Sequence, residues 1–359
     1  GDTRHPLLGA AVPLAGGDGH LLTGRLSLRT HPWLADHAVA GVVLLPATAF
    51  VELATRAGDQ VGCDLVEELT MESPLVVPET GGVQLQLTVG DADASGRRSL
   101  SFHSRPETGA DTDGAEPEPW TRHATGVLAV DGAATDATGF DLAQWPPHGA
   151  EKVAIDGLYE EFAAADVQYG PAFQGLCGVW RLGDEVFAEV SVPEERRDEA
   201  GRFGLHPVLL DAALQAAHLA QDPADGDESG APRLPFAWSD VELYADGAKS
   251  LRVRLSRSGS GGDTVSVLLA DDSGAPVARV GSLVSRAVDV RQGLATRRTR
   301  VAHLYRVNWV RPAAVDPARA EAAWKFVNFM AGKPYTVAKR WAVEKGLGFG
   351  QLPLFEDQD

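Results

Sequence analysis

Short segments in which apolar and polar residues alternate recur along most of this chain, and they limit its fold more than any other feature. The clearest lies at 82–90 (GVQLQLTVG), where Val83, Leu85, Leu87 and Val89 fall on one side of an extended backbone. The pattern predicts a sheet-rich protein whose strands are joined by polar, glycine-rich turns. Further strands are predicted at 21–28, 98–104, 120–130, 179–192, 251–257 and 265–288.

Two segments interrupt this pattern and predict helices, one in each half of the chain. The first follows Pro46 (PATAFVELATRAG), and Gly58 is its predicted end. The second spans 207–220 (PVLLDAALQAAHLA). A polar stretch at 131–150, rich in glycine and alanine, separates the halves and reads as a linker. Periodicity alone therefore predicts a duplicated α+β protein.

The composition argues against several classes of protein. A net charge of −18 disfavours nucleic-acid binding, because such a surface repels phosphate backbones. With only Cys63 and Cys177, the chain has neither a disulfide framework nor a thiolate metal site. Since no apolar run reaches the length of a membrane helix and the first residues lack a secretion signal, we expect a cytoplasmic protein.

His37 is the first candidate for chemistry. Gly41 and Pro46 follow it, just before the first predicted helix. An imidazole can act as a general base, and backbone N–H groups at a helix entrance can polarise a substrate carbonyl. The alternative is that one of ten histidines happens to precede a helix.

Asp211 is the second candidate, and Gln215 shares its face of the second predicted helix. An aspartate among apolar residues usually has a raised pKa, which suits a proton donor. The alternative is a capping aspartate near the start of the helix.

Two further segments stand out, at 169–173 (YGPAF) and 234–238 (LPFAW). The first can hold a phenol at the edge of a pocket, and the second reads as the entry to a buried strand. The chain contains no GxGxxG after a strand, no GxxxxGK[ST], no HExxH and no GxSxG, and its other histidines lack the spacing of metal ligands.

Taken in this order, the four segments resemble the dehydratase domains of modular type I polyketide synthases, and the resemblance covers about residues 1–311. The family motif HxxxGxxxxP falls on His37, Gly41 and Pro46, and YGPxF falls on Tyr169, Gly170, Pro171 and Phe173. The motif DxxxQ falls on Asp211 and Gln215, and LPFxW falls on Leu234, Pro235, Phe236 and Trp238.

The resemblance implies a double hot-dog fold, in which two curved antiparallel sheets each wrap around a central helix. The implied divisions are an N-terminal half at 1–135 with His37, a linker at 136–150, a C-terminal half at 151–290 with Asp211, and a linker after the dehydratase at 291–320.

The resemblance also implies a reaction: loss of water from a 3-hydroxyacyl thioester on an acyl carrier protein, giving a 2-enoyl thioester. His37 would be the general base and Asp211 the general acid. The N–H of Gly41 would hold the thioester oxygen, while Gln215 and Tyr169 would orient the acid or the leaving hydroxyl. Both catalytic side chains would then have to converge on one tunnel between the halves.

Cofactors and partners follow from the same resemblance. The phosphopantetheine arm belongs to the carrier protein, so the domain would need no cofactor or metal of its own. The expected partners are that carrier, the neighbouring acyltransferase and ketoreductase domains and a second copy of the chain.

Two other functions stay open: a double-bond isomerase or oxygen-ring-forming cyclase on the same fold, and a non-catalytic dimerisation module.

The sequence departs from the family pattern at two places, which affect substrate fit more than the reaction. Ala47 stands where the family usually has glycine, and Asp166 begins a run that is often GYxYGP. The tail at 321–359 fits nothing in the family. Its four lysines contrast with the arginine-rich body, which suggests a GC-rich bacterial genome for the body and a different origin for the tail.

Overall fold

The computed structural model describes residues 5–107, 118–130, 142–220, 233–258 and 264–287. They all belong to one compact unit, 1–298. The predicted linker at 291–320 and the tail at 321–359 lie outside the described residues.

The N-terminal half is a sheet wrapped around helix α1 (Ala47–Val61). Alternation in the sequence explains the sheet, since every second residue of β6 is buried, as predicted. Its strands are β1 (Ala10–Pro13), β2 (His20–Leu26), β5 (Leu65–Met71), β6 (Val83–Val89), β7 (Arg98–Pro106) and β8 (Thr121–Ala129).

The C-terminal half repeats this arrangement around helix α4 (Pro207–Gln215). Two shorter helices, α2 (Leu158–Ala164) and α3 (Arg197–Ala200), accompany it. Its strands are β9 (Glu151–Val153), β11 (Leu176–Leu182), β12 (Glu185–Ser191), β13 (Arg233–Leu243), β14 (Ser250–Ser258), β15 (Thr264–Ala270) and β16 (Pro276–Ala287).

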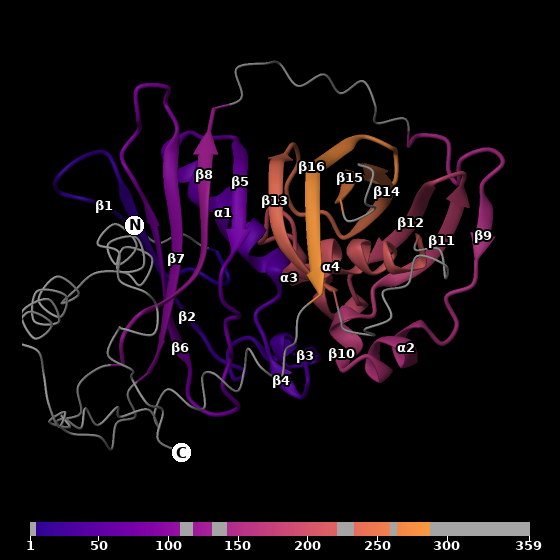
Figure 1. Ribbon diagram of the computed structural model, residues 1–359, viewed down its shortest axis with the longest axis horizontal. Coiled ribbons are helices and arrows are strands. Elements are labelled where there is room, and N and C mark those ends of the chain that lie inside the picture. The colour runs from indigo at the N-terminus through magenta and orange to yellow at the C-terminus, as the bar shows by residue number, and fades with distance from the viewer. Residues whose placement is uncertain (1–4, 108–117, 131–141, 221–232, 259–263, 288–359) are drawn as a thin grey trace, which may run out of the picture. The chain divides into compact units, whose positions relative to one another are not determined.

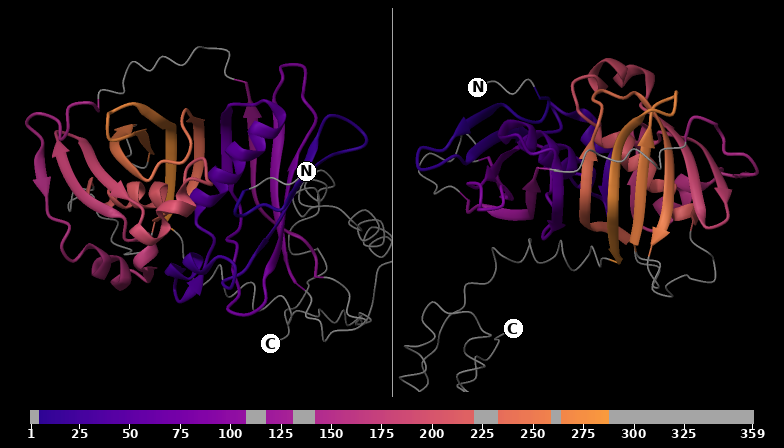
Figure 2. Two further views of the ribbon diagram at one scale, coloured as in Figure 1. Left: turned by 180° about the vertical axis from the view of Figure 1, so that it is seen from behind. Right: turned by 90° about the horizontal axis from the view of Figure 1, so that it is seen from above.

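The two half-sheets join edge to edge through β5 and β13. All pairings are antiparallel, and the result is a 13-stranded sheet in the order β1-β2-β6-β7-β8-β5-β13-β16-β15-β14-β12-β11-β9. Figure 1 shows the indigo and violet half meeting the magenta and orange half at this seam, and both views of Figure 2 agree. Helices α1 and α4 also pack against each other. The double hot-dog prediction is confirmed.

The predicted end of the first helix is wrong by one turn. Helix α1 continues through Gly58 and ends at Gly62, whose left-handed backbone (φ 72°) favours glycine. Gly58 is a glycine for a different reason, because a Cβ there would lie 2.5 Å from the carbonyl oxygen of Cys63. A glycine required by close packing is thus read from sequence as a stop signal.

The second helix is shorter than predicted, ending at Gln215, with a separate 3-10 turn at His218–Ala220. His206 caps its start: Nδ1 accepts a hydrogen bond from the N–H of Val208. Since the cap is His206, the alternative in which Asp211 caps the helix is wrong.

A second, three-stranded sheet ties the halves together and was not predicted. Its order is β10-β3-β4, so a strand from the C-terminal half pairs with a hairpin from the N-terminal half. Asp166 precedes β10 with a left-handed backbone (φ 62°), which explains why a glycine is usual there and why aspartate is tolerated. The strands are β3 (His37–Val39), β4 (Val42–Val43) and β10 (Val167–Tyr169).

The stretch predicted as a linker is only partly described, from Leu142 onward. Leu142 is fully buried, and Trp145 packs its ring against Trp180 and Phe187 of the C-terminal half. Residues 142–150 are therefore packed onto this half.

Candidate active site

His37 is buried at the start of β3, and its tautomer follows from its hydrogen bond. Nδ1 lies 3.0 Å from the carbonyl oxygen of Leu44. Because a carbonyl only accepts, Nδ1 must carry the hydrogen. A neutral imidazole then leaves the lone pair of Nε2 free to accept a proton.

Asp211 lies in the middle of α4 and is almost fully buried. Burial raises the pKa of this carboxyl above its ordinary value, which favours the protonated form. The charge of His37 and hydrogen bonds from Gln215 and Tyr169 oppose that shift without cancelling it. Since the charge of His37 acts on it, Asp211 lies within electrostatic reach of the imidazole, although the two come from different halves.

Tyr169 contacts both residues of this pair. It lies directly opposite His37 in the β3–β10 pairing, with ring centroids 5.8 Å apart. Its hydroxyl donates a hydrogen bond to Asp211. Burial of that hydroxyl, followed by the neighbouring carboxylate, raises the pKa of Tyr169 well above its ordinary value, so it remains a donor.

The turn after Tyr169 is held by a very close approach of the two halves. The N–H of Gly170 donates to the carbonyl of Asp36, and the N–H of Ala172 donates to Asp36 Oδ2 at 2.8 Å. A Cβ on Gly170 would lie 2.4 Å from the carboxylate of Asp36, so only glycine fits. Pro171 is exposed and opens the 3-10 turn Pro171–Phe173.

Phe173 and Gln215 complete the contacts around the pair. The buried ring of Phe173 lies 5.2 Å from that of His37. Gln215 Nε2 donates to the carbonyl of Phe173 at 2.9 Å and to Asp211 Oδ2 at 3.4 Å. Five residues predicted as site residues are therefore brought together: His37, Tyr169, Phe173, Asp211 and Gln215.

Gly41 does not lie where its predicted role requires. It is exposed in the two-residue turn between β3 and β4, with a left-handed backbone (φ 75°). The helix entrance lies further along the chain: Pro46 is the N-cap of α1, and Ala47 is its first residue. The N–H groups of the first helical turn have no acceptor within the helix, so Ala47 holds the position expected for Gly41.

Leu234 and Pro235 support the site from β13. Leu234 packs against the small apolar cluster formed by Val39, Leu44 and Val167, next to the strands that carry His37 and Tyr169. Pro235 lies where the pairing of β13 with β16 shifts register, a position at which a missing N–H is tolerated.

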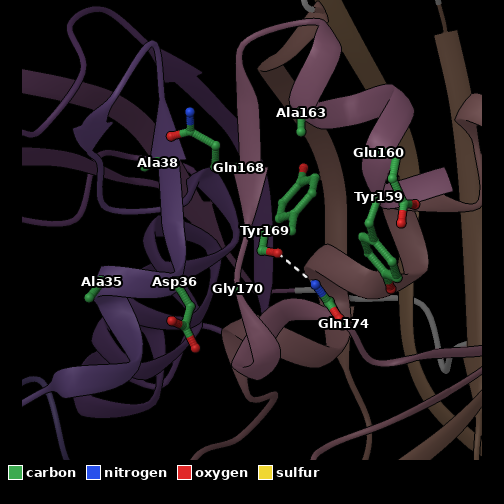
Figure 3. Close-up of a pocket in the computed structure, with 10 residues that line it drawn as sticks. All are labelled: Ala35, Asp36, Ala38, Tyr159, Glu160, Ala163, Gln168, Tyr169, Gly170 and Gln174. Carbon is green, nitrogen blue, oxygen red and sulfur yellow. Dashed lines mark hydrogen bonds between the residues drawn. The ribbon is translucent and has the colours of Figure 1, made fainter. Parts of the chain in front are cut away.

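A pocket of about 440 Å³ opens beside β10 (Figure 3). It lies between the β3 region of one half and α2 of the other, and His37 and Asp211 do not line it. It reaches the site through Tyr169 and Tyr159, which both form part of its wall. Its lining consists of Ala35, Asp36, Ala38, Tyr159, Glu160, Ala163, Gln168, Tyr169, Gly170 and Gln174.

Tyr159 was missed from the sequence. It belongs to α2, and its hydroxyl donates to Gln215 Oε1 at 3.2 Å. The spacing of Leu158, Tyr159 and Phe162 is helical and would have predicted α2. No local pattern indicates that Tyr159 reaches Gln215, because that contact depends on how α2 packs against α4.

Within the part of the chain that the structure describes, no cluster of three or more histidine, cysteine, aspartate or glutamate side chains is arranged to hold a metal ion. No helix in the same ranges is long and apolar enough to cross a membrane.

Two family models match the chain. Residues 5–105 match the model described as the polyketide synthase dehydratase domain, and residues 137–295 match the one described as the polyketide synthase dehydratase N-terminal domain. Together they cover both halves of the double hot-dog.

Curated relatives are much longer than this chain. Polyketide synthase GfsA from Streptomyces halstedii is 57% identical over 335 residues, which cover 92% of this chain but 4% of that protein. Pikromycin polyketide synthase component PikAII from Streptomyces venezuelae is 56% identical over 295 residues, covering 81% of this chain and 8% of that protein.

A solved structure matches at full domain length. The bifunctional dehydratase-cyclase domain in ambruticin biosynthesis is 47% identical, with a TM-score of 0.72, and the match covers 81% of this chain and 99% of that domain. A match of this identity over nearly the whole of a solved domain establishes common ancestry, and the chain belongs to the dehydratase domains of modular type I polyketide synthases.

Proposed function

We propose that this domain removes water from a 3-hydroxyacyl thioester and produces a 2-enoyl thioester. The observation that carries the proposal is the placement of an imidazole and a buried carboxyl with a raised pKa across the junction of the halves, both in contact with Tyr169. Such a pair can remove a proton and supply one in the same site.

In the proposed reaction His37 acts as the base. Its Nε2 takes the proton from C2 of the substrate, next to the thioester carbonyl. The hydrogen bond from Nδ1 to the carbonyl of Leu44 holds the ring in place and, in the neutral imidazole, leaves the lone pair of Nε2 free. Phe173 and Tyr169 flank the ring and limit its contact with water.

Asp211 acts as the acid and gives its proton to the departing 3-hydroxyl. The C2–H and C3–O bonds break, a C2–C3 double bond forms, and water leaves. No electrons are gained or lost overall. The step leaves an imidazolium beside a carboxylate, and proton exchange through solvent restores the starting forms.

The N–H of Ala47 is the proposed donor to the thioester oxygen. It lies at the N-terminus of α1, where the helix dipole favours developing negative charge. Only two residues separate Ala47 from Leu44, whose carbonyl holds His37. Ala47 therefore takes the role of donor to this oxygen that the sequence predicted for Gly41, because Gly41 lies exposed in a turn.

The substrate would arrive on the phosphopantetheine arm of an acyl carrier protein, so the thioester group would come with that partner. The relatives are large bacterial synthases. We therefore place the domain in the cytoplasm beside acyltransferase and ketoreductase domains, as one of two copies. Mixing the domain with the carrier protein tests that partner, and measuring the mass of the domain in solution tests whether it forms a dimer.

The test of the reaction is a mass assay. A 3-hydroxyacyl chain on carrier protein or pantetheine should lose the mass of one water when incubated with the domain, and both 3-hydroxy epimers should be tried. Folded protein that converts neither epimer for chains of several lengths and branching patterns contradicts the proposal.

A second candidate is ring formation after dehydration. It is suggested by the solved dehydratase-cyclase domain, which at 47% identity is as similar to this chain as a solved dehydratase from the borrelidin and fluvirucin synthases. A substrate with a second hydroxyl further along the chain would give an oxygen ring with the same mass as the open enoyl product. Chromatography and NMR of the released product separate the two outcomes.

A further inference from the structure

Tyr159 connects the pocket wall to the proposed acid. Its half-buried ring lines the pocket together with Tyr169 (Figure 3). Its hydroxyl lies 3.2 Å from Gln215 Oε1, and Gln215 in turn contacts Asp211. This tyrosine comes from α2, which carries none of the family motifs.

The hydrogen bonds that link Tyr159, Gln215 and Phe173 each have only one possible direction. The carbonyl of Phe173 only accepts, so the atom of Gln215 that faces it at 2.9 Å must be the amide nitrogen. The amide oxygen then faces Tyr159, whose hydroxyl must donate to it. The oxygen of Tyr159 also accepts a hydrogen bond from the backbone N–H of Leu176. This series of hydrogen bonds therefore ends on backbone groups on both sides, at Phe173 and at Leu176.

This polarity has a consequence at Asp211. The amide nitrogen of Gln215 points a hydrogen at Oδ2, at 3.4 Å. A carboxyl oxygen that accepts a hydrogen bond from an N–H group does not also carry the acidic proton on the side that faces this donor. The proton of the neutral carboxyl is therefore favoured on Oδ1, the oxygen turned away from Gln215.

We propose that Tyr159 is a positioning residue: by holding the side-chain amide of Gln215 in one orientation, it keeps the proton of Asp211 on Oδ1, ready for transfer to the leaving hydroxyl. This inference rests on the proposed dehydration. Without Tyr159, only the carbonyl of Phe173 would hold the amide, so the weaker hydrogen bond from Gln215 to Oδ2 would loosen and the proton would be less strictly kept on Oδ1.

Other groups also act on Asp211 and must stay unchanged in any test. His37 faces it from β3, Tyr169 from β10 and Gln215 from its own helix, while Tyr159 adds an electrostatic effect from α2. Replacing Tyr159 by phenylalanine removes one hydroxyl and leaves the ring at the pocket wall.

The experiment measures the rate of water loss against pH for the wild type and for Tyr159→Phe. We expect kcat to fall about 3- to 10-fold, the effect of one hydrogen bond, with KM changed by less than about twofold. Because the bond from Gln215 lowers the pKa of Asp211, loosening it should move the basic limb of the kcat profile to higher pH.

A double-mutant cycle separates positioning from a general structural effect. In a Gln215→Leu background, Tyr159→Phe should have almost no further effect on kcat, since there is no amide left to orient. The matched control is Tyr244→Phe, which removes another half-buried hydroxyl, bonded to Glu242 at 2.9 Å on β13. That control should leave kcat and its pH profile unchanged.

Three outcomes overturn the inference: unchanged kcat in Tyr159→Phe, an equal effect of Tyr159→Phe with and without Gln215, or the same loss in Tyr244→Phe. Thermal unfolding of every variant confirms that the compared proteins are folded. A wild-type domain that removes no water contradicts the proposed function itself, which is a different result from an active wild type with an unaffected variant.

Discussion

Tyr169 lies directly opposite His37 in the small sheet, and their ring centroids are 5.8 Å apart. The hydroxyl of the same tyrosine bonds Asp211, so one side chain contacts both residues of the proposed pair. His37 belongs to the N-terminal half, whereas Tyr169 and Asp211 belong to the C-terminal half. The site is therefore assembled by the junction between the halves, and neither half contains it alone.

Removing either member of the pair should abolish dehydration while the protein stays folded. His37→Ala takes away the base, and Asp211→Asn leaves an amide that cannot deliver an acidic proton. We expect each variant to lose at least about 100-fold in kcat, in line with general acid–base catalysis. The mass assay measures the loss, and circular dichroism checks the fold. Near-normal activity in either variant would remove that residue from the mechanism.

Asp211→Asn should also stabilise the protein at neutral pH. The folded-state pKa of Asp211 is raised above the ordinary 3.8, so its contribution to stability is complete below that value and is lost as the pH rises through the folded-state pKa. An amide has no proton to lose and avoids this penalty. Tm of the variant should exceed that of the wild type at pH 7, and the gap should close near pH 3.

The position of the thioester-oxygen donor can be tested through the backbone. Ala47→Pro removes one N–H at the first position of α1, where proline fits the helix and the extended backbone of Pro46 tolerates it. We expect kcat to fall about 100- to 1,000-fold. Gly41→Ala should instead cost about 1 kcal/mol of stability, because its φ is 75°, and leave kcat nearly unchanged. The reverse result would show that the N–H of Gly41, and not that of Ala47, binds the thioester oxygen.

Glu52 should prove important for holding the two halves together. This buried carboxylate of α1 accepts hydrogen bonds from His5 Nε2 at 2.9 Å and from the backbone N–H groups of Gly204 and Leu205 at 2.9 and 2.7 Å. Nδ1 of His5 accepts from Leu7, so its Nε2 carries the hydrogen. Glu52→Gln turns an amide N–H toward at least one of these donors, and we expect a loss of about 2–4 kcal/mol.

Urea unfolding measures that loss, and Glu67→Gln is the control. Glu67 forms an exposed ion pair with Arg97, so its replacement should change the free energy of unfolding by less than about 1 kcal/mol. Equal effects of the two substitutions would show that the buried carboxylate has no special role.

The sequence alone determined most strands of the large sheet and its two central helices, and it singled out His37 and Asp211 as candidates for the chemistry. The alternation from Val83 to Val89 marks a one-sided strand, and Asp211 within an apolar helix already suggests a raised pKa. These are local properties, because burial of one face repeats with the period of the backbone itself.

Only the tertiary structure decided how those segments meet. The pairing of Tyr169 with His37, the seam between β5 and β13 and the contact of Tyr159 with Gln215 join residues far apart in the chain. The periodicity of apolar residues in a segment shows which of its faces is buried, but not which other segment packs against that face. For the same reason Gly41 and Gly58 were misread: a glycine fits a turn, a helix end or a close approach equally well, and its neighbours in space determine which applies.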